Sequence, residues 1–445
     1  MYSYKEIFRM TLPLMFGTFV HSVVVFTDAV FVSELGDTAI GASGNASLMF
    51  MAFFMFCRGL GDGTQIAIAR LDGQGEDKKI GETIFHAQIY QAIISGLLFS
   101  ILFLFGDAIV YSFSKNQDVA ELMIDYLNVR GWGLILAAQH MILASFFIGI
   151  GKTRVIFISA LIIAGSNIFL DYCFIFGNFG FPELGMIGAP LASSISEGLG
   201  FVYLLVYLLT KSSYKKYAYS FFQKINLRVH FAIIKLSFPL MLQGVIALST
   251  WLVFFTLIEH SGKGPLETAH NIRYMYFLAF VPIFGFAAST KTIVSNLVGQ
   301  GRQDLIKKVQ NRIIFMSVLS MVIIFHGAIL YPEFLIRLVD QNPNLDPVVL
   351  ADSVYILRFI SGSILIYSIA VIYFNTIAGL GKTTVYFFIE VFSIFLYLVG
   401  CYFFIVLWKW DIKMVWWVEY IYFLCFLIFS VLYLYFYRRN LIKNE

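Results

Sequence analysis

Three polar residues stand out because they interrupt long apolar stretches of this sequence. Asp28 lies inside the apolar run at residues 12–36, and Asn167 and Asp171 lie inside another run at residues 154–177. A helix crosses the hydrocarbon of a bilayer with about 20 apolar residues, so both runs can span a membrane. A carboxylate inside such a helix costs roughly 2.5–3.5 kcal/mol on insertion scales, and such residues usually mark an ion or substrate path. The pattern therefore predicts a binding site for a coupling proton or cation.

The spacing of these residues places them at a similar depth. Asn167 and Asp171 are four residues apart, so they share one helix face. Counted from the outer helix ends near Gly36 and Gly177, at a rise of about 1.5 Å per residue, Asp28 lies at a comparable level. Close carboxylates repel each other in a low dielectric, so at least one should bind a proton readily. Their oxygens suit a partly hydrated Na⁺ equally well, so both H⁺ and Na⁺ are open as ligands.

The composition is that of a helical membrane protein. Of the 445 residues, 59% are hydrophobic and 13% are charged, whereas a soluble domain has roughly 25% charged residues. Twelve apolar segments leave no room for a soluble domain between them: 8–33, 45–69, 82–105, 119–148, 154–177, 186–210, 230–258, 267–296, 309–331, 348–378, 383–408 and 414–437. We expect an all-α polytopic membrane protein with twelve transmembrane helices, the first of them retained and not a signal peptide.

Lys and Arg are distributed unequally between alternate connections of these segments. Most lie in the connections on the side that also holds both termini. The other side, with its adjoining helix ends, holds only Lys115, Lys263, Arg337, Lys409 and Lys413. Because cytoplasmic loops carry the excess of basic residues, both termini are predicted to be cytoplasmic, with the protein in the inner (cell) membrane.

The second half of the sequence repeats short motifs of the first half at nearly constant spacing. They are Pro-Leu-Met at 13–15 and 239–241, Gly-Gln-Gly at 73–75 and 299–301, and Gly-x-Gly-Lys-Thr at 149–153 and 379–383. Each half then has six helices, and two such lobes should be related by a pseudo-two-fold axis along the membrane normal. The predicted lobes are residues 1–210 and 230–445, joined by a basic cytoplasmic linker at 211–229. Pro13 and Pro239, inside the first helix of each lobe, predict kinks.

The repeat also tests whether the polar cluster has a purely structural role. In the second half, the positions equivalent to Asp28, Asn167 and Asp171 hold Phe254, Tyr397 and Cys401. A structural role should be needed in both lobes, so the asymmetry favours function for the cluster in the N-terminal lobe.

Other titratable residues inside apolar segments are weaker candidates. Glu197 falls near mid-membrane in the same lobe and could join a secondary proton network with His21, although a hydrogen-bonded core histidine is the simpler interpretation of His21. Arg130 is expected near a helix end or in a pair. Glu390 lies nearer the cytoplasm and is expected to cap or pair locally.

The sequence contains no motif for enzymatic chemistry. The Gly-Lys-Thr at 151–153 has Phe146 where a phosphate-binding loop needs its first glycine, so transport energy should come from an ion gradient and not from ATP. No nucleophile triad, metal-ligand cluster, cofactor motif or nucleic-acid motif is found. The four cysteines lie in apolar runs and are expected to be free thiols.

Several motifs together resemble the multidrug and toxic compound extrusion (MATE) family. Thr-Asp-Ala-Val-Phe-Val at 27–32 resembles its helix 1 signature, and Asn-Ile-Phe-Leu-Asp at 167–171 resembles its helix 5. Ala-Arg at 69–70 with Gly-Gln-Gly at 73–75, and the connection at 177–192, are also similar. The resemblance implies twelve helices in two lobes and export of drug-like cations in exchange for Na⁺ or H⁺.

The resemblance also implies roles for individual residues. Asp28, Asn167 and Asp171 look like the cation-site residues of the archaeal and DinF-like branches, and Ser193 stands where that site often has a small hydroxyl residue.

The second lobe departs from the NorM-like branch. The acid on that branch's seventh helix would fall here at Ala247 or Leu248, and no acid lies between Ile356 and Gly379. The sequence therefore weighs against a cation site in the second lobe.

Two transport functions remain open. A multidrug antiporter would use part of the abundant aromatic residues (48 Phe, 25 Tyr) and 14 Met to line a cavity for flat or cationic organic substrates. The alternative is a flippase for a lipid-linked oligosaccharide or cell-wall precursor, which would need several Lys or Arg in its cavity to hold a diphosphate. The expected partners are small organic molecules and membrane lipid, without nucleic acid, and the protein is expected to be a monomer.

Overall fold

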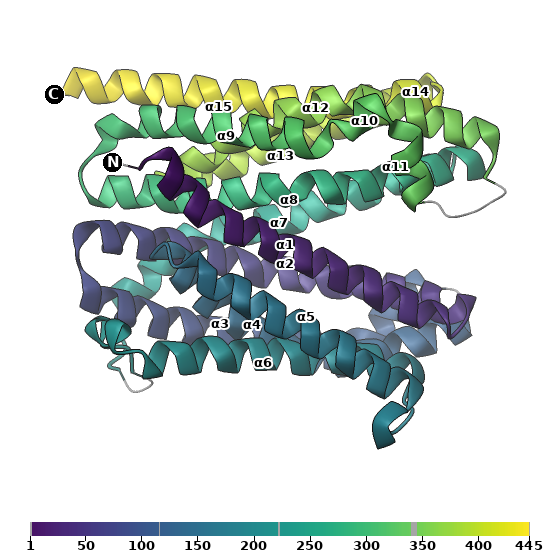
Figure 1. The fold of residues 1–445 in the computed structure, drawn as a ribbon, viewed down its shortest axis with the longest axis horizontal. Coiled ribbons are helices and arrows are strands. Elements are labelled where there is room, and N and C mark those ends of the chain that lie inside the picture. The colour runs from purple at the N-terminus through teal and green to yellow at the C-terminus, as the bar shows by residue number, and fades with distance from the viewer. Residues whose placement is uncertain (1, 115, 221–222, 340–344, 445) are drawn as a thin grey trace. The chain divides into compact units, whose positions relative to one another are not determined.

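The computed structural model describes residues 2–114, 116–220, 223–339 and 345–444, and its secondary structure over these ranges is entirely helical (Figure 1). Twelve helical segments of the described chain are long and apolar enough to cross a membrane, and each corresponds to one predicted apolar segment. The twelve-helix prediction is therefore confirmed.

Twelve long α-helices of the described ranges form the core of the twelve spans. They are α1 (Tyr4–Ser33), α2 (Asp37–Gln74), α3 (Asp77–Phe113), α4 (Gln117–Gly149), α5 (Thr153–Phe176), α6 (Gly188–Thr210), α7 (Leu227–Glu259), α8 (Lys263–Gly299), α9 (Ile306–Phe325), α12 (Pro347–Gly379), α13 (Thr383–Cys401) and α15 (Trp417–Asn444). Short helices complete the chain: η1 (Asn178–Gly180), η2 (Gly185–Ile187), η3 (Ser212–Tyr217), η4 (Gln303–Leu305), α10 (Gly327–Leu330), α11 (Pro332–Val339), η5 (Tyr402–Leu407) and α14 (Ile412–Val415).

The chain divides into two compact units. The N-terminal unit is Leu12–Val245, and the C-terminal unit combines Met1–Thr11 with Ile246–Glu445. The boundaries of these units fall inside α1 and α7. The division into two lobes at residues 1–210 and 230–445, joined by a linker at 211–229, stays a prediction.

Side-chain packing explains these boundaries. The beginning of α1 is held in the C-terminal unit, where Thr11 Oγ1 donates a hydrogen bond to Ser289 Oγ of α8 at 2.9 Å. The first half of α7 packs closely on α2 in the N-terminal unit. A Cβ placed on Gly59 would lie 2.3 Å from the backbone of Met241, so only glycine permits this approach.

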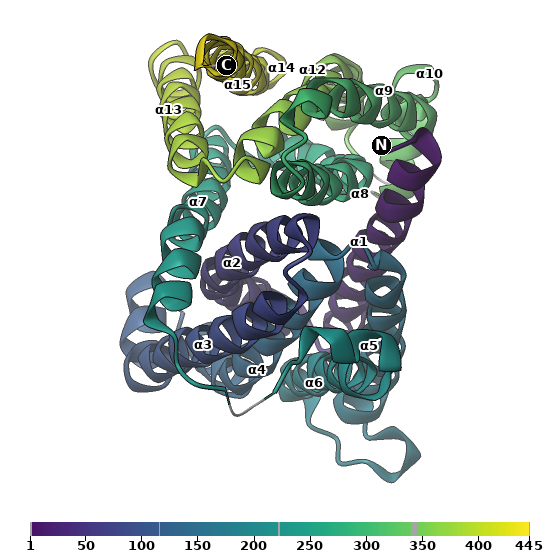
Figure 2. The same ribbon diagram turned by 90° about the vertical axis from the view of Figure 1, so that its left-hand side faces the viewer.

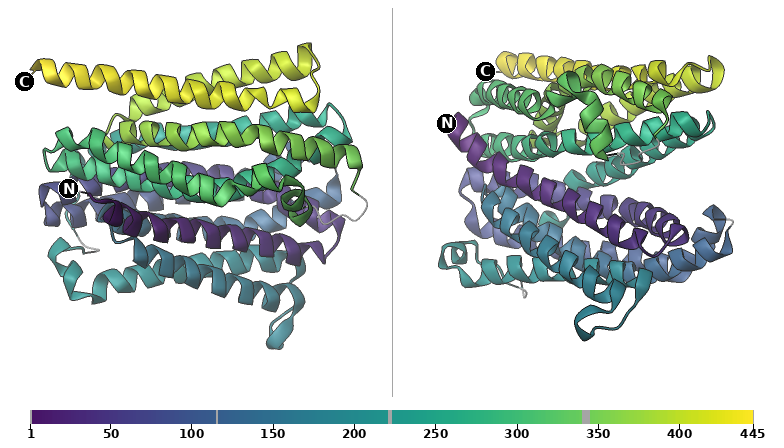
Figure 3. Two further views of the ribbon diagram at one scale, coloured as in Figure 1. Left: turned by 45° about the horizontal axis from the view of Figure 1, so that its top comes forward. Right: turned by 45° about the vertical axis from the view of Figure 1, so that its right-hand side comes forward.

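Within the N-terminal unit, α4 is the central helix. It packs against α2, α3 and α6, and α5 lies beside α6 (Figures 2 and 3). In the C-terminal unit, α12 packs against α8, α9 and α15, and α13 packs against α15. The ends of the chain in the C-terminal unit, the start of α1 and the end of α15, lie at the same end of that unit (Figure 1).

The backbone preserves the sequence repeat. Gly75 and Gly301, which end equivalent helices, have φ values of 72° and 71°, and Gly151 and Gly381 have 71° and 77°. A positive φ of this kind is strained for residues with a Cβ, which explains why glycine stands at both copies. Pro13 and Pro239 lie inside continuous α-helices, so kinks at these residues stay a prediction.

Candidate functional site

Ring contacts position α1 against α5. The ring of Phe31 packs edge-on against Phe176 with centroids 5.8 Å apart, and Phe16 packs on Phe157 at the same distance. These contacts lie on either side of Asp28 along α1, so they turn its carboxyl toward the polar face of α5.

The structure brings the four predicted site residues together in the N-terminal unit. The carboxyl of Asp28 lies close to the Asp171 carboxyl and to the Ser193 hydroxyl. Asn167 Nδ2 donates a hydrogen bond to Ser193 Oγ at 3.2 Å, which leaves the Ser193 hydroxyl proton free to point toward Asp28. Asp171 and Asn167 are 0% and 1% exposed, so α5 directs both side chains into the protein and not into lipid.

This cluster contains more hydrogen-bond acceptors than donors. Among the residues that the structure describes, no hydrogen-bond partner is present for Asp28 Oδ1, Asn167 Oδ1 or either carboxylate oxygen of Asp171. Buried polar atoms are almost always paired in folded proteins, because an unpaired buried acceptor loses its hydration without compensation. Two facing carboxylates with an amide oxygen beside them therefore call for a proton or a cation.

An ion pair lies near the cluster. Arg130 of α4 donates two hydrogen bonds of 2.7 Å to the two carboxylate oxygens of Glu197 on α6. The guanidinium also lies 4.1 Å from the centroid of the Phe50 ring. Gly133 makes room for it, since a Cβ there would lie 2.7 Å from Arg130 Nη1. The sequence predicted that Arg130 lies near a helix end or in a pair, and the structure shows it in a pair.

The two residues of the suggested secondary proton network have different surroundings. Glu197 is neutralised by Arg130, and its carboxylate is therefore not an isolated proton acceptor. His21 lies about two turns from Asp28 on α1, and its side chain is exposed. A proton network through Glu197 and His21 stays a prediction.

The repeat-equivalent positions also meet in the C-terminal unit, but they carry different chemistry. The rings of Phe254 and Tyr397 lie 5.9 Å apart, and Cys401 on the same helix as Tyr397 is fully buried. All four cysteines have free thiols, as predicted.

Sequence reasoning missed a buried acid, Glu419 of α15, which is 3% exposed. The sequence does indicate this residue, because Glu419 interrupts the apolar segment 414–437 in the same way that Asp28 interrupts the first apolar segment.

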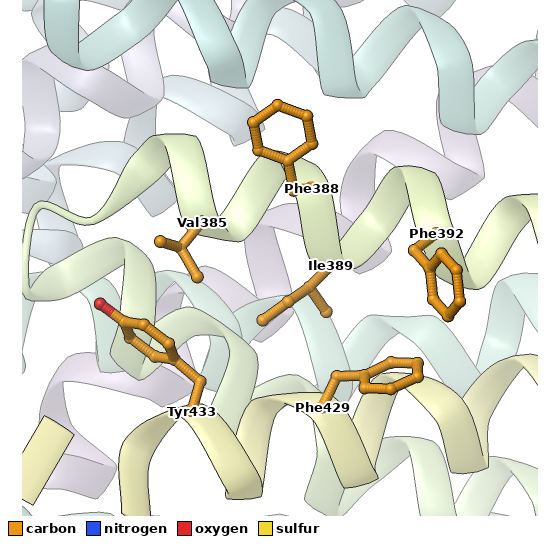
Figure 4. Close-up of a pocket in the computed structure, with 6 residues that line it drawn as sticks. All are labelled: Val385, Phe388, Ile389, Phe392, Phe429 and Tyr433. Atoms are coloured by element: carbon orange, nitrogen blue, oxygen red, sulfur yellow. The ribbon is translucent and has the colours of Figure 1, made fainter. Parts of the chain in front are cut away.

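A groove of about 350 Å³ between α13 and α15 has apolar walls (Figure 4). Val385, Phe388, Ile389, Phe392 and Phe429 line it, and the Tyr433 hydroxyl is its one polar side-chain group. It shares no residue with the acidic cluster of α1 and α5.

A family model and several curated proteins match this sequence. The family model MatE matches the chain twice, at residues 13–173 and 239–403, so that each match begins at one of the repeated prolines. The Probable multidrug resistance protein NorM of Synechocystis sp. is 27% identical over 76% of this chain and 74% of its own length. The Multidrug resistance protein NorM of Photobacterium profundum is 26% identical over 68% of this chain and 66% of its own length.

Solved structures share the fold. A multidrug resistance MATE family transporter of the MOP superfamily, in an outward-facing conformation, superposes with a TM-score of 0.88 at 18% identity, covering 99% of this chain and 96% of that one. A MOP superfamily transporter from Pyrococcus furiosus gives the same TM-score and identity, covering 98% and 95%. With both of its halves matched by the family model, the chain belongs to the MatE (MATE) family and is a transporter, not an enzyme.

Proposed function

We propose that this multi-pass membrane protein exports organic, often cationic, drug-like compounds by alternating access, in exchange for H⁺ or Na⁺ bound at Asp28, Asn167, Asp171 and Ser193. Relatives named multidrug resistance proteins support the export of drugs. The observation that carries the coupling site is the set of buried, unpaired oxygens where Asp28 and Asp171 face each other.

Counting charges limits what the site can bind. With Arg130 and Glu197 neutralising each other, Asp28 and Asp171 together carry two negative charges when both are ionised. A site of low dielectric is stable only near neutrality, so we infer that the loaded state holds two protons, or one proton and one Na⁺. The Asn167 carbonyl oxygen and the Ser193 hydroxyl provide further oxygen ligands for Na⁺.

The loaded and empty states should differ in the packing of α1. When the ions leave, the two carboxylates repel each other, and α1 is the helix that can move away from α5. A bend at Pro13 would allow that movement because proline removes one helical hydrogen bond. Such a change in α1 would alter the drug affinity of the N-terminal unit.

A flippase for a diphosphate-linked precursor is less well supported. Such a substrate needs cationic side chains that are free to bind phosphate. In the N-terminal unit, the buried guanidinium of Arg130 is already held by both oxygens of Glu197.

The proposal includes a location and an orientation. The excess of Lys and Arg on one side favours cytoplasmic termini. We further propose that the protein acts as a monomer in the inner (cell) membrane, surrounded by lipid.

The test is drug efflux from proteoliposomes under an imposed proton gradient or an imposed sodium gradient. Asp28→Asn should abolish gradient-driven efflux, because it removes one of the two facing carboxylates, while the protein remains inserted. Asp107→Asn is a matched control, since Asp107 is an exposed acid on α3. Efflux at the wild-type rate in the Asp28 variant would refute the proposed coupling site, and the gradient that drives wild-type efflux identifies the ion.

A further inference from the structure

A second buried acid lies in the C-terminal unit. Glu419, in the first turn of α15, is 3% exposed, and Trp416 just before it is 1% exposed. The Glu419 carboxyl therefore lies among protein atoms and not in lipid or water.

The groups around the Glu419 carboxyl are hydroxyls and a thiol. The Tyr397 hydroxyl of α13 donates a hydrogen bond to Glu419 Oε1 at 3.2 Å. The Tyr276 hydroxyl of α8 lies close to the same carboxyl, and Tyr276 is 1% exposed. This hydroxyl has no hydrogen-bond partner among the described residues, so it is a donor available to the carboxyl. The buried thiol of Cys401 lies nearby.

Within the described part of the chain, no basic side chain forms an ion pair with Glu419. Lys413 of α14 instead pairs with Asp352 of α12, with 2.8 Å between Nζ and Oδ1. Arg358 of α12 is exposed and donates to a backbone carbonyl of α10. Arg273 of α8 lies over the rings of Phe255 and Tyr274, at 5.1 and 5.6 Å from their centroids.

The remaining titratable groups that face Glu419 are neutral or acidic. They are the phenol of Tyr422 on α15 and, beyond it, Glu390 on α13. The hydroxyl of Tyr420, the next residue on α15, donates instead to the backbone oxygen of Phe359. Burying a carboxylate without a positive partner costs much free energy, and binding a proton removes that cost by neutralising the charge.

The location of Glu419 corresponds to the coupling site of the other half. Its partner Tyr397 and its neighbour Cys401 occupy the positions that Asn167 and Asp171 hold in the first half. The C-terminal unit thus has an acid at the equivalent place, supplied by its last helix.

We propose that Glu419 is a proton-binding site of the C-terminal unit, whose carboxyl alternates between a protonated form and an ionised form that the hydroxyls of Tyr397 and Tyr276 stabilise. The proton is exchanged with water, and only O–H bonds form and break. This site is separate from the proposed coupling site in the N-terminal unit and does not depend on it.

Polar groups continue from this site along α13 and α15. The ring of Tyr397 packs on Tyr422 at 5.5 Å, and the Tyr422 hydroxyl donates a hydrogen bond of 2.7 Å to Glu390 Oε1. Glu390 is thus paired locally, with a different tyrosine from the one that donates to Glu419.

Infrared difference spectroscopy of the purified, full-length protein tests the proposal, because it detects the C=O stretch of a protonated carboxyl directly. The background variant is Asp28→Asn with Asp171→Asn, which removes the carboxyls of the N-terminal cluster. We expect a carboxyl band that disappears as the pH rises in this background and in the same background with Glu390→Gln. The band should be lost when Glu419→Gln is added.

Tyr397→Phe provides a second readout that keeps the carboxyl in place. Loss of one hydrogen bond to the ionised form should move the titration midpoint of the band to higher pH by about one unit. An unchanged band in the Glu419→Gln variant would overturn the proposal, and an unchanged midpoint in Tyr397→Phe would overturn the role of the phenol. Size-exclusion chromatography of each variant confirms that it is folded. The result is distinguishable from a failure of the proposed export mechanism, which would show as wild-type efflux in the Asp28→Asn variant alone.

Discussion

Replacing Glu197 by Gln should destabilise the N-terminal unit strongly. The substitution keeps the size of the side chain but leaves the guanidinium of Arg130 buried without a counter-charge. The two side chains are 9% and 18% exposed, and two hydrogen bonds of 2.7 Å join them. Removing one partner of a buried ion pair costs about 3–5 kcal/mol, and the partial exposure of Glu197 favours the lower end of that range.

The assay is thermal unfolding of the purified protein in detergent, for the two single variants Glu197→Gln and Arg130→Met and for the double variant. Each single variant should unfold at a clearly lower temperature than the wild type. The double variant should lose less than the sum of both, because neither charge is left unpaired. Additive losses, or a Glu197→Gln protein as stable as the wild type, would refute this account.

The same variant decides the role of Glu197 in transport. An essential proton carrier would lose gradient-driven efflux on conversion to Gln even when the protein is folded. If Glu197 instead balances the charge of Arg130, the folded fraction of Glu197→Gln protein should still respond to the ion gradient.

Three further predictions concern other parts of the molecule. Gly59→Ala should destabilise the protein by about 1–3 kcal/mol, because the added Cβ would lie 2.3 Å from backbone atoms of α7. The control Gly96→Ala should be neutral in the same thermal assay, because no heavy atom lies within 4 Å of its added Cβ. Glu390→Gln should keep substantial drug efflux in proteoliposomes, and complete loss would mean that the C-terminal unit participates in coupling through this residue. The hydrogen bond with Asp77 raises the pKa of Lys216 above its usual 10.5. The small stabilisation from this exposed pair should therefore be present below pH 10.5 and be lost as the pH rises through the raised pKa. A Lys216→Met variant whose loss of stability relative to the wild type does not shrink over that pH range would contradict this.

The transmembrane spans were predictable because hydrophobicity alone determines which segments can cross a bilayer. The meeting of Asp28 with Asp171 was also within reach of the sequence, since depth follows from counting residues along two helices of one lobe. The left-handed glycines at the ends of repeated helices were visible as repeated motifs.

Features that depend on helix rotation and on packing between distant helices were not predictable in the same way. The ion pair between Arg130 and Glu197 forms because of the faces that α4 and α6 turn toward each other, and the sequence does not give those faces. The boundary of the units inside α7 depends on Gly59 fitting against Met241, and no periodicity reports that contact. Glu419 was overlooked because it lies near the start of its apolar segment, where an acid resembles an ordinary residue at a helix end.

The paired glycines have an evolutionary consequence. Gly75 and Gly301, and Gly151 and Gly381, keep nearly identical backbone angles in the two copies, while the side chains at the Asp28 and Asp171 positions have become Phe254 and Cys401. The bends of the chain are therefore alike in both copies, whereas the acids stand on different helices: α1 and α5 in the N-terminal unit, and α15 in the C-terminal unit. A search for functional acids in relatives should accordingly follow location in the folded lobe, and not alignment of the two halves alone.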